Sequence, residues 1–324
     1  MDIVIREATP ADGPALAEVE RHSPLVMGDS SLAIDRGDDY FAAARLMGSP
    51  TVLIAEADGR AVGAYCGAAH PVMLGGERRT MLYIHHARIL PEFQDHGIGK
   101  KFGEYLHPKY RDTTDSLYWY ISRDNAHSQA YARRALNRWT FGPSLIGIDT
   151  PAFSGRHGGR VATPADAPAI VAMLNFAHAR EEMFLPYTEA SLAERLTRAP
   201  AQYGWPRLWL AGRAVVGVWP EGESISVRHT AADGTVTVAR GAAVLDFGYL
   251  PGGEADLLEA LRAWSAWLAP RGMSELSIFS SPGCRHWPLL KDLGHRTEFD
   301  FWTPSIPQPE GAEARGLHVD HVYF

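Results

Sequence analysis

The alternation of apolar and polar residues in the first half of the chain predicts strands and helices in a regular order. Ile3–Glu7 is a short strand-like run, and Ala15–Arg21 has helical spacing, with Thr9 as a suitable N-cap before it. Two β-type runs, Thr51–Glu56 and Ala61–Ala69, flank an Asp-Gly pair that is typical of a tight hairpin turn. The chain therefore begins with a strand, a helix and a hairpin.

The same half continues with longer elements. Arg79–Leu90 is predicted as a long strand and Gly99–Tyr110 as a helix. A strand, a helix and a final strand are then expected at Ser116–Ser122, Ala126–Arg138 and Trp139–Ile148. The resulting order, β-α-β-β-β-α-β-α-β, belongs to the α/β class of folds.

The pattern restarts after residue 159, which indicates an internal duplication. Ala162–Asp166 repeats the Ala-Thr-Pro-Ala-Asp sequence of Ala8–Asp12, again after a short strand. The glycine-rich segment 154–159 is expected to be a linker between domains at 1–153 and 160–324. In the second domain we predict strands at Pro206–Ala211, Ala214–Trp219, Ala242–Leu250, Glu275–Phe279 and Gly316–Phe324, and helices at Glu254–Leu268 and Trp287–Leu293.

Composition and charge exclude several classes of protein. The 324 residues carry 31 Lys and Arg against 38 Asp and Glu, so there is no basic surplus for binding nucleic acid. The sequence has no uninterrupted apolar stretch of about 18 residues, and we expect no membrane span. The N-terminus has no signal-peptide layout, and Cys66 and Cys284 are far apart, so we expect a cytoplasmic protein.

The segment Gln94–Gly99 stands between the long strand and the following helix. Its two glycines let the backbone approach a ligand closely, and the first N–H groups of the helix have no partner within it. The helix dipole adds roughly half a positive charge at this end. The loop is thus predicted to hold a phosphate group, most simply a pyrophosphate. An ordinary strand-to-helix turn is the alternative.

Two well-known phosphate loops do not fit this segment. A Walker loop needs Ser or Thr after its Gly-Lys pair, and Lys101 follows Lys100 here. A dinucleotide fingerprint needs a third glycine at position 102, which is Phe102. The remaining pattern, [Q/R]-x-x-G-x-[G/A], matches without error.

With Pro91-Glu92 before it and Lys100 after it, this loop resembles the acetyl-CoA loop of the GNAT acyltransferases. The resemblance implies two tandem GNAT-like domains, each with a mixed sheet and a cofactor helix at a splayed strand. It implies direct, acetyl-CoA-dependent N-acetylation of a primary amine on a small molecule. It also implies that the loop N–H groups hold the pyrophosphate, while the end of the strand pairs with the pantetheine arm and offers an N–H to the thioester carbonyl. The cofactor residues so implied are Arg88, Ile89, Leu90, Gln94, Asp95, His96, Gly97, Ile98, Gly99 and Lys100.

The segment from Asn125 to Leu136 is similar to the family motif N-x-x-A-x-x-x-Y-x-x-x-G-F. It departs from that motif in three ways: Asn125 and Tyr131 are one residue closer, Ser128 replaces Ala, and Ala-Leu replaces Gly-Phe. The resemblance implies that Asn125, Ser128 and Tyr131 contact the cofactor. It makes Tyr131 the donor to the departing thiolate. Since the pKa of a tyrosine, about 10, exceeds that of a thiol, Tyr131 would act mainly as a hydrogen-bond donor. Packing of its ring on the sheet is the alternative.

A base for the acceptor amine is expected on the long strand. Tyr83 and His85 alternate onto one face of it, and His86 and Arg88 onto the other. His85 titrates near neutral pH and is the better base, while Tyr83 could orient a water or the acceptor. A sheet histidine with its hydrogen bonds satisfied is the alternative for His85.

The second copy lacks the loop. After Leu250 the two glycines are adjacent, and Glu254 and Asp256 place negative charge at the helix N-terminus, where it repels phosphate. We expect this copy to have lost CoA binding and to help shape the acceptor pocket. CoA binding through other contacts is the alternative. We expect no metal site, because His318 and Asp320 face away from His321 on a strand.

Several questions stay open at this stage. A longer acyl-CoA, an oxygen or thiol acceptor, or a non-catalytic acyl-CoA sensor remain alternatives to the acetyltransferase. The oligomeric state, monomer or homodimer, is also open. The acidic residues Glu18, Glu20, Asp29 and Asp35 lie in the segment expected to cap the acceptor site, which favours a cationic amine.

Overall fold

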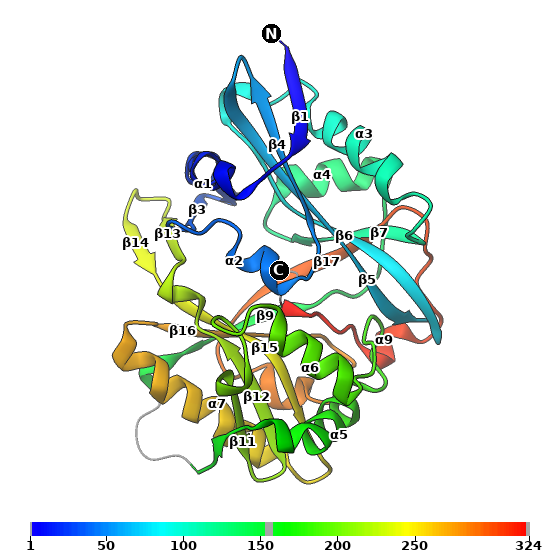
Figure 1. The fold of residues 1–324 in the computed structure, drawn as a ribbon, viewed down its shortest axis with the longest axis vertical. Coiled ribbons are helices and arrows are strands. Elements are labelled where there is room, and N and C mark those ends of the chain that lie inside the picture. Colours follow the sequence, from blue (N-terminus) through cyan, green and yellow to red (C-terminus); the bar gives the residue numbers. More distant parts are fainter. Residues whose placement is uncertain (1, 153–157, 322–324) are drawn as a thin grey trace.

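The computed structural model describes residues 2–152 and 158–321, so most of the predicted linker, 154–157, lies outside the described residues. Figure 1 shows the N-terminal half above the C-terminal half, with strands from both meeting between them. No helix in the described ranges is long and apolar enough to cross a membrane.

The first half confirms most of the predicted elements. The predicted last strand is shorter than expected and is preceded by a two-residue strand, β8 (Asn137–Arg138). The short elements β2 (Leu25–Met27), β3 (Ser30–Asp35) and α2 (Ala42–Leu46) were not predicted. The remaining elements are β1 (Ile3–Glu7), α1 (Gly13–His22), β4 (Thr51–Ala57), β5 (Arg60–Leu74), β6 (Glu77–Ile89), α3 (Ile98–Tyr110), β7 (Ser116–Ser122), α4 (Ala126–Ala135) and β9 (Ser144–Asp149).

The second half contains every predicted strand and helix except the last strand. The prediction of a strand over Gly316–Phe324 is wrong for residues 316–321, which form only an isolated bridge at Leu317; residues 322–324 lie outside the described range. The elements are β10 (Arg160–Val161), α5 (Ala167–His178), α6 (Glu189–Arg198), β11 (Leu208–Ala211), β12 (Ala214–Trp219), β13 (Ser226–Thr230), β14 (Val236–Ala239), β15 (Gly241–Tyr249), α7 (Glu254–Leu268), β16 (Glu275–Ser280), α8 (Trp287–Leu290), β17 (His295–Thr303) and α9 (Ala312–Arg315).

The hydrogen bonds at the start of each half repeat the duplication seen in the sequence. Arg6 makes a two-pronged ion pair with Asp12, and Arg160 makes the same pair with Asp166. Each aspartate also accepts the backbone N–H of the threonine three residues before it, at 2.7 and 2.8 Å. The repeated Thr-Pro-Ala-Asp sequence therefore forms one capping box in each half.

The two halves exchange their last strands within one mixed sheet. Its order is β1-β4-β5-β6-β7-β17-β9-β16-β15-β12-β11-β10. The final strand of the first half, β9, pairs with β16 of the second, and β17 of the second half pairs with β7 of the first. The two exchanged strands pair with each other at the centre. Strands from both sides of the predicted linker thus belong to one sheet. The division into domains at residue 153 stays a prediction.

Each half has a parallel strand pair that separates after three residues. Strand β6 pairs with β7 only from Met81 to Tyr83. Its counterpart β15 pairs with β16 only from Gly241 to Ala243. Beyond these points each pair splays, which leaves the remaining N–H and C=O groups on the facing edges without strand partners. The mixed sheet with splayed strands expected from the sequence is present in both copies.

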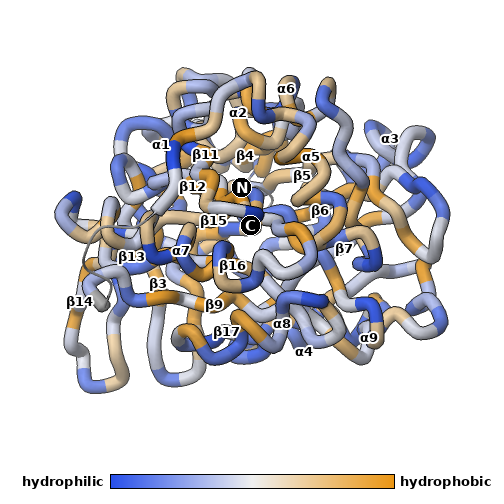
Figure 2. Tube along the Cα trace, turned by 90° about the horizontal axis from the view of Figure 1, so that it is seen from below, coloured by the Kyte–Doolittle hydropathy of each residue, from blue (hydrophilic) through white to orange (hydrophobic). Residues whose placement is uncertain are grey.

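Apolar side chains from both halves share one core. Tyr83 and Tyr118 of the first half belong to the same buried cluster as Leu192, Tyr203 and Leu245 of the second. Figure 2 shows apolar segments concentrated along the central strands, with polar residues on the outer loops. A small second sheet, β14-β13-β3-β2, also joins the halves, because β3 pairs with β13.

The exchange makes a specific prediction for Gly294, which precedes β17. A Cβ at this position would collide with the carbonyl oxygen of Gly147 in β9. We expect Gly294→Ala to destabilise the protein by roughly 2 kcal/mol, as overpacking does, in a single transition for both halves. Urea unfolding followed by tryptophan fluorescence and circular dichroism measures this.

Gly103→Ala is the control, since nothing lies within 4 Å of a Cβ there. An unchanged midpoint for Gly294→Ala, or two separate transitions, would contradict a shared sheet.

Candidate functional site

The loop between β6 and α3 has an unusual backbone. Asp95 and Gly97 both adopt left-handed conformations, with φ of 64° and 75°. Left-handed residues next to ordinary ones turn successive N–H groups toward one point, which makes an anion-binding nest. The Gln94 amide donates to the carbonyl of Ile89 at 3.5 Å, and the His96 ring contacts the Gln94 carbonyl at 2.8 Å. The loop is thereby attached to the end of β6.

The N–H groups of the nest have no acceptor within residues 2–152 and 158–321. The first helical hydrogen bond runs from Lys101 N–H to Gly97 O, and within the described residues none of the N–H groups from Asp95 to Lys100 donates to a backbone carbonyl. Nothing lies within 4 Å of a Cβ built at Gly97 or Gly99. Glycine within a helix costs about 1 kcal/mol relative to alanine, and packing gives no reason for it at Gly99. A ligand that lies against the backbone here would give a reason for glycine at this position.

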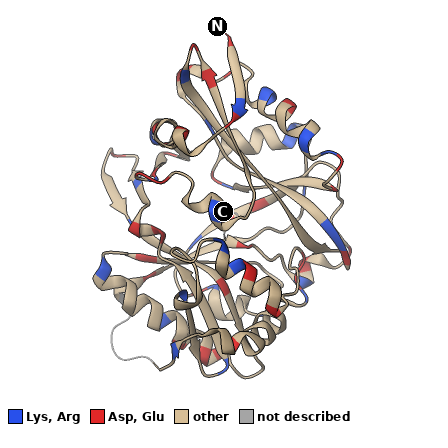
Figure 3. Ribbon diagram, viewed as in Figure 1, with Lys and Arg blue, Asp and Glu red and all other residues tan. Residues whose placement is uncertain are grey.

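Basic residues lie along the helix that follows. Figure 3 shows Lys and Arg residues on α3. Lys101 donates to the carbonyl of Ile3, and Lys109 pairs with Glu7. Lys100 is highly exposed and lies 3.5 Å from Glu104. Its ammonium is thus available to an anion bound at the helix N-terminus.

A bulge interrupts β6 beside the splay. His85 pairs with Cys66 and Arg88 with Ala64, so two residues of β6 face one of β5. His86 lies within the bulge with a φ of 49°. The expected alternation of faces therefore does not hold: the rings of His85 and His86 touch, with centroids 4.5 Å apart. A bulge cannot be recognised from the apolar pattern, because the extra residue looks like one more strand position.

The hydrogen bonds of this histidine pair fix where its protons are. Arg36 contacts His86 Nε2 at 2.5 Å, and a guanidinium only donates, so His86 carries its proton on Nδ1. That Nδ1 lies 2.6 Å from His85 Nδ1, which must accept. His85 therefore carries its proton on Nε2. Among the described residues this buried Nε2 has no hydrogen-bond partner.

The electrostatics agree with a neutral His85. Burial lowers its pKa to about 3, and the nearby charges of Arg36 and Arg88 act in the same direction. The expectation of a base with an ordinary histidine pKa thus has no support here: His85 is a hydrogen-bond donor at neutral pH. Tyr83 is buried and stacks on His85 at 4.9 Å. Burial raises the pKa of Tyr83, so its phenol keeps its proton.

Three of the four acidic residues expected near the acceptor are paired with arginines. Glu20 binds Arg36 at 2.5 Å, and Arg88 lies 3.9 Å from the same carboxylate. Glu18 and Asp35 both pair with Arg21. The acidic lining that would favour a cationic acceptor is therefore largely neutralised.

Sequence reasoning missed other groups near this site. Arg36 is buried and sets the tautomers of both histidines. Glu221, from the second half, has its pKa raised to about 7 by burial, with Arg36 acting in the opposite direction. Neither lies in a motif, and their positions depend on how the halves pack.

Tyr131 lies on α4, close to the helix that follows the loop. Its side chain is 64% exposed. It is close enough to Tyr65 of β5 to contribute to the raised pKa of that buried phenol, for which burial is the larger cause. Tyr65 in turn stacks on Phe102 of α3 at 4.9 Å. The loop helix, β5 and Tyr131 are thus brought together.

The other two predicted residues of this motif form the start of α4. The Asn125 side chain accepts the backbone N–H of Ser128 at 3.0 Å and so acts as the N-cap. Their role in binding the cofactor stays a prediction.

The second copy differs at both equivalent places. A Cβ at Gly253 would lie 2.9 Å from the Leu250 carbonyl, so this glycine has a packing reason. The Asp256 carboxylate at the start of α7 accepts the Arg213 N–H at 2.8 Å. No ligand is needed to explain either residue.

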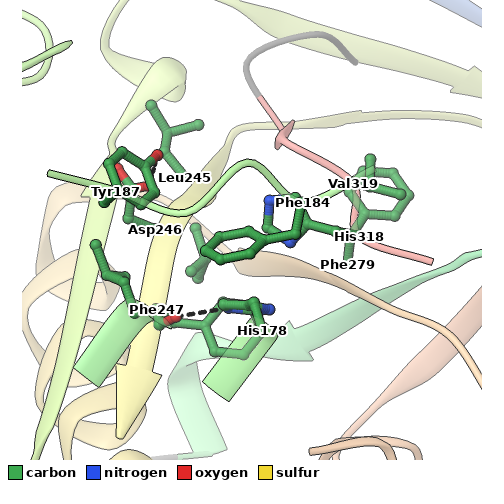
Figure 4. A pocket seen from close by; sticks show the side chains of 11 residues that line it. His178, Phe184, Tyr187, Leu245, Asp246, Phe247, Phe279, His318 and Val319 are labelled. Carbon is green, nitrogen blue, oxygen red and sulfur yellow. Dashed lines mark hydrogen bonds between the residues drawn. The ribbon is translucent and has the colours of Figure 1, made fainter. Parts of the chain in front are cut away.

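The second splay is also filled by the chain itself. In the segment 316–321, Leu317 N–H donates to Ser281 Oγ at 2.6 Å, and the His321 ring contacts the Val244 carbonyl at 3.2 Å. Val244 lies in β15, and Ser281 directly follows β16, so the segment contacts both sides of the splay. Figure 4 shows His318 and Val319 of this segment beside Phe279 of β16, close to Phe247 of β15.

The three residues considered as metal ligands do not converge. Asp320 pairs with Arg195 at 2.6 Å, while His318 lies 3.4 Å from Glu181. His321 is engaged with the Val244 carbonyl. They are therefore not a ligand set of their own.

Comparisons with known proteins agree with this arrangement. Residues 21–137 match the sequence model of the acetyltransferase (GNAT) family. No curated protein sequence matches the chain. N-myristoyltransferase from Saccharomyces cerevisiae with bound myristoyl-CoA is similar in structure, with a TM-score of 0.67 and 8% identity, over 95% of this chain and 84% of that one.

A GCN5-related N-acetyltransferase from Sphaerobacter thermophilus aligns with a TM-score of 0.54 and 15% identity, over 95% of this chain and 97% of that one. At these identities the likenesses concern the fold. The sequence match covers the strand, the loop and Tyr131. On this basis residues 21–137 are similar in sequence to the GNAT family of acyltransferases, and the chain has the fold of the similar N-acyltransferases.

Proposed function

We propose that the first half transfers an acetyl group from acetyl-CoA to the primary amine of a small molecule. The observation that supports this proposal is the row of N–H groups from Asp95 to Lys100, which have no backbone acceptor in the described part of the chain and are open at Gly97 and Gly99. Such a nest suits a pyrophosphate. It stands at the end of β6, whose edge beyond Tyr83 is free for the pantetheine arm.

In this proposal the reaction is a direct transfer. Arg88, Ile89 and Leu90 offer backbone groups to the pantetheine arm and the thioester carbonyl. The neutral amine attacks the carbonyl carbon, a C–N bond forms and the C–S bond breaks. The sulfur leaves as a thiolate and receives a hydrogen bond from the Tyr131 hydroxyl. The proton of the ammonium leaves through water.

His85 has a different role in this scheme from that of a base. Its Nε2–H is buried, unpaired among the described residues, and fixed as a donor by His86 and Arg36. We assign it to an oxygen of the acceptor or of an ordered water. Tyr83 supports the His85 ring by stacking on it.

The buried charges suggest the kind of acceptor. Arg36 and Arg88 surround the carboxylate of Glu20, and burial raises the pKa of the nearby Glu221 to about 7. While Glu221 keeps its proton, one positive charge is in excess. A buried unpaired cation is costly, so an acceptor with a carboxylate near its amine would be favoured. The pocket beside His85 and His86 is small, which favours a short acyl group.

A longer acyl chain with a peptide amine is the second candidate. It is favoured by the higher TM-score of the myristoyl-CoA-bound myristoyltransferase. An oxygen or thiol acceptor, or CoA binding without turnover, are the further alternatives. Release of free thiol from acetyl-CoA or myristoyl-CoA, with panels of amino acids, other amines and peptides, separates all of these.

The nest is tested by adding a side chain at Gly99, where nothing lies within 4 Å of a Cβ. Gly99→Val should weaken CoA binding at least about tenfold, or roughly 1.4 kcal/mol, because the side chain occupies the approach of the pyrophosphate. Isothermal calorimetry with CoA measures this.

The matched control is Gly103→Val, one turn further along the same helix and equally open. The Gly103 N–H is paired within the helix, so its variant should bind CoA normally. Equal affinities of Gly99→Val and the unmodified protein would refute the loop assignment.

Tyr131→Phe tests the chemistry. We expect kcat to fall about 100-fold, as on loss of a donor to developing charge, with the KM for acetyl-CoA unchanged. Tyr105→Phe on α3, whose hydroxyl is 3.5 Å from Glu7, should retain full activity. Thiol release in steady state gives both constants. Normal turnover by Tyr131→Phe would remove Tyr131 from the mechanism.

The neutral state of His85 makes a prediction about pH. Its folded pKa, about 3, lies below the ordinary value of 6.5, so its contribution to stability is complete above pH 6.5 and is lost as the pH falls. Between pH 6.5 and 5 this amounts to about 2 kcal/mol.

Urea unfolding at these two pH values should therefore show a smaller loss for His85→Asn than for the unmodified protein. His22→Asn, at an exposed histidine, is the control variant. If the free energy of unfolding had the same pH dependence with and without His85, the fold would not be lowering the pKa of this histidine, which would contradict the prediction.

A further inference from the structure

A cluster of buried polar side chains in the second half takes no part in the proposed reaction. Glu181 follows α5, and Cys284 and His286 lie in the loop between β16 and α8. One ligand atom of each lies within 4.8 Å of the others. All three side chains are buried. They stand next to the splay that the C-terminal segment fills.

The carboxylate of Glu181 is bonded on one side only. Its Oε2 lies 2.7 Å from His178 Nδ1, while His178 Nε2 donates to the Phe247 carbonyl at 2.8 Å (Figure 4). His318 approaches the same oxygen at 3.4 Å. His178 thus contacts one oxygen of this carboxylate, and the carboxylate itself is buried.

The other side of the carboxylate has no hydrogen bond. Glu181 Oε1 and His286 Nδ1 are both fully buried and both lack a partner among the described residues. They face each other at 3.5 Å. An unsatisfied buried polar group is costly, and native proteins rarely keep two side by side. Something that binds an anionic oxygen and a nitrogen lone pair at once would satisfy both.

We propose that Glu181, Cys284 and His286 bind a divalent transition metal, preferably zinc, between the turn after α5 and the loop after β16. Ligand distances of about 2.0–2.3 Å in a tetrahedron place neighbouring ligand atoms roughly 3.3–3.5 Å apart. The separation of Glu181 Oε1 and His286 Nδ1 agrees with this. Carboxylate, imidazole and thiolate together favour zinc over magnesium or calcium, which prefer oxygen ligands alone.

The surroundings provide the supporting hydrogen bonds that such a site needs. The Ser281 hydroxyl lies 3.2 Å from Cys284 Sγ and can donate to a thiolate there. His178 orients Glu181 from the far side. Residues behind metal ligands commonly play these parts. Ser281 also accepts the Leu317 N–H, so the ion would fasten the C-terminal segment in the second splay.

Cobalt is a suitable probe, because a Co²⁺–thiolate bond gives a charge-transfer band in the near ultraviolet. The full-length protein is treated with a chelator, dialysed and titrated with Co²⁺, and then with Zn²⁺ in competition. We expect one Co²⁺ per chain, a charge-transfer band, and its loss on addition of zinc. Zinc should also raise the thermal unfolding midpoint, and magnesium should not.

The chain offers a matched control, since it has only two cysteines. Cys284→Ser should abolish the band, while Cys66→Ser, at a buried cysteine in the first half, should keep it. Glu181→Gln and His286→Ala should weaken Co²⁺ binding at least about 100-fold. His295→Ala, at an exposed histidine that pairs with Glu275 at the start of β17, should bind Co²⁺ normally.

Absence of a band in the unmodified protein would overturn the proposal. A band that survives Cys284→Ser would overturn it as well. Because Cys284→Ser is nearly isosteric, its circular dichroism and unfolding midpoint without metal show whether a lost band reflects lost ligation or lost folding. Zinc measured in the freshly purified protein by mass spectrometry gives an independent readout: one ion per chain supports the site, and none in protein expressed with added zinc contradicts it.

Discussion

The exchange of final strands between the two halves is the constraint on which the rest of the structure depends. Because β17 of the second half stands beside β7, it carries Asp300 to the base of α4. That buried aspartate accepts from Gln129 of α4 at 3.0 Å and from Arg123 at 3.1 Å. The second half therefore helps to position the helix that bears Tyr131. A duplicated fold has become one unit in which neither copy has a complete sheet without the other.

The same exchange explains how two similar copies can have different tasks. Both halves keep a parallel strand pair that opens after three residues. In the first, the opening leads to a loop with free N–H groups. In the second, residues 316–321 fill the opening, and Asp256 and a packed glycine occupy the helix start. In our account the first copy binds CoA, and the second supports its site and retains buried polar groups for another purpose.

The sequence predicted the features that depend on local physics. These features depend on residues that are close in the sequence: strand periodicity, the Asp58-Gly59 turn, the repeated Thr-Pro-Ala-Asp cap and the Gln94–Gly99 loop. These gave the fold class and the resemblance to the GNAT acyltransferases. Strand β3 was not predicted from the sequence, and its partner, β13, lies in the other half. The apolar pattern of a strand shows which of its faces is buried, but it does not show which strand is its partner. Strand exchange therefore cannot be predicted from it.

The candidate site was harder to predict for the same reason. His85 looked like a base because its ordinary pKa suits one. Its burial, its neighbour His86 in the bulge and the distant Arg36 together make it a neutral donor. The Glu181 cluster combines two segments that are about 100 residues apart in the sequence, so only the fold could bring it together.

The most direct test of two copies with one working site is the stoichiometry of CoA binding by calorimetry on the full-length chain. The account predicts one CoA per chain. Two CoA per chain would show that the second splay opens to the cofactor, and would contradict the division of tasks between the copies.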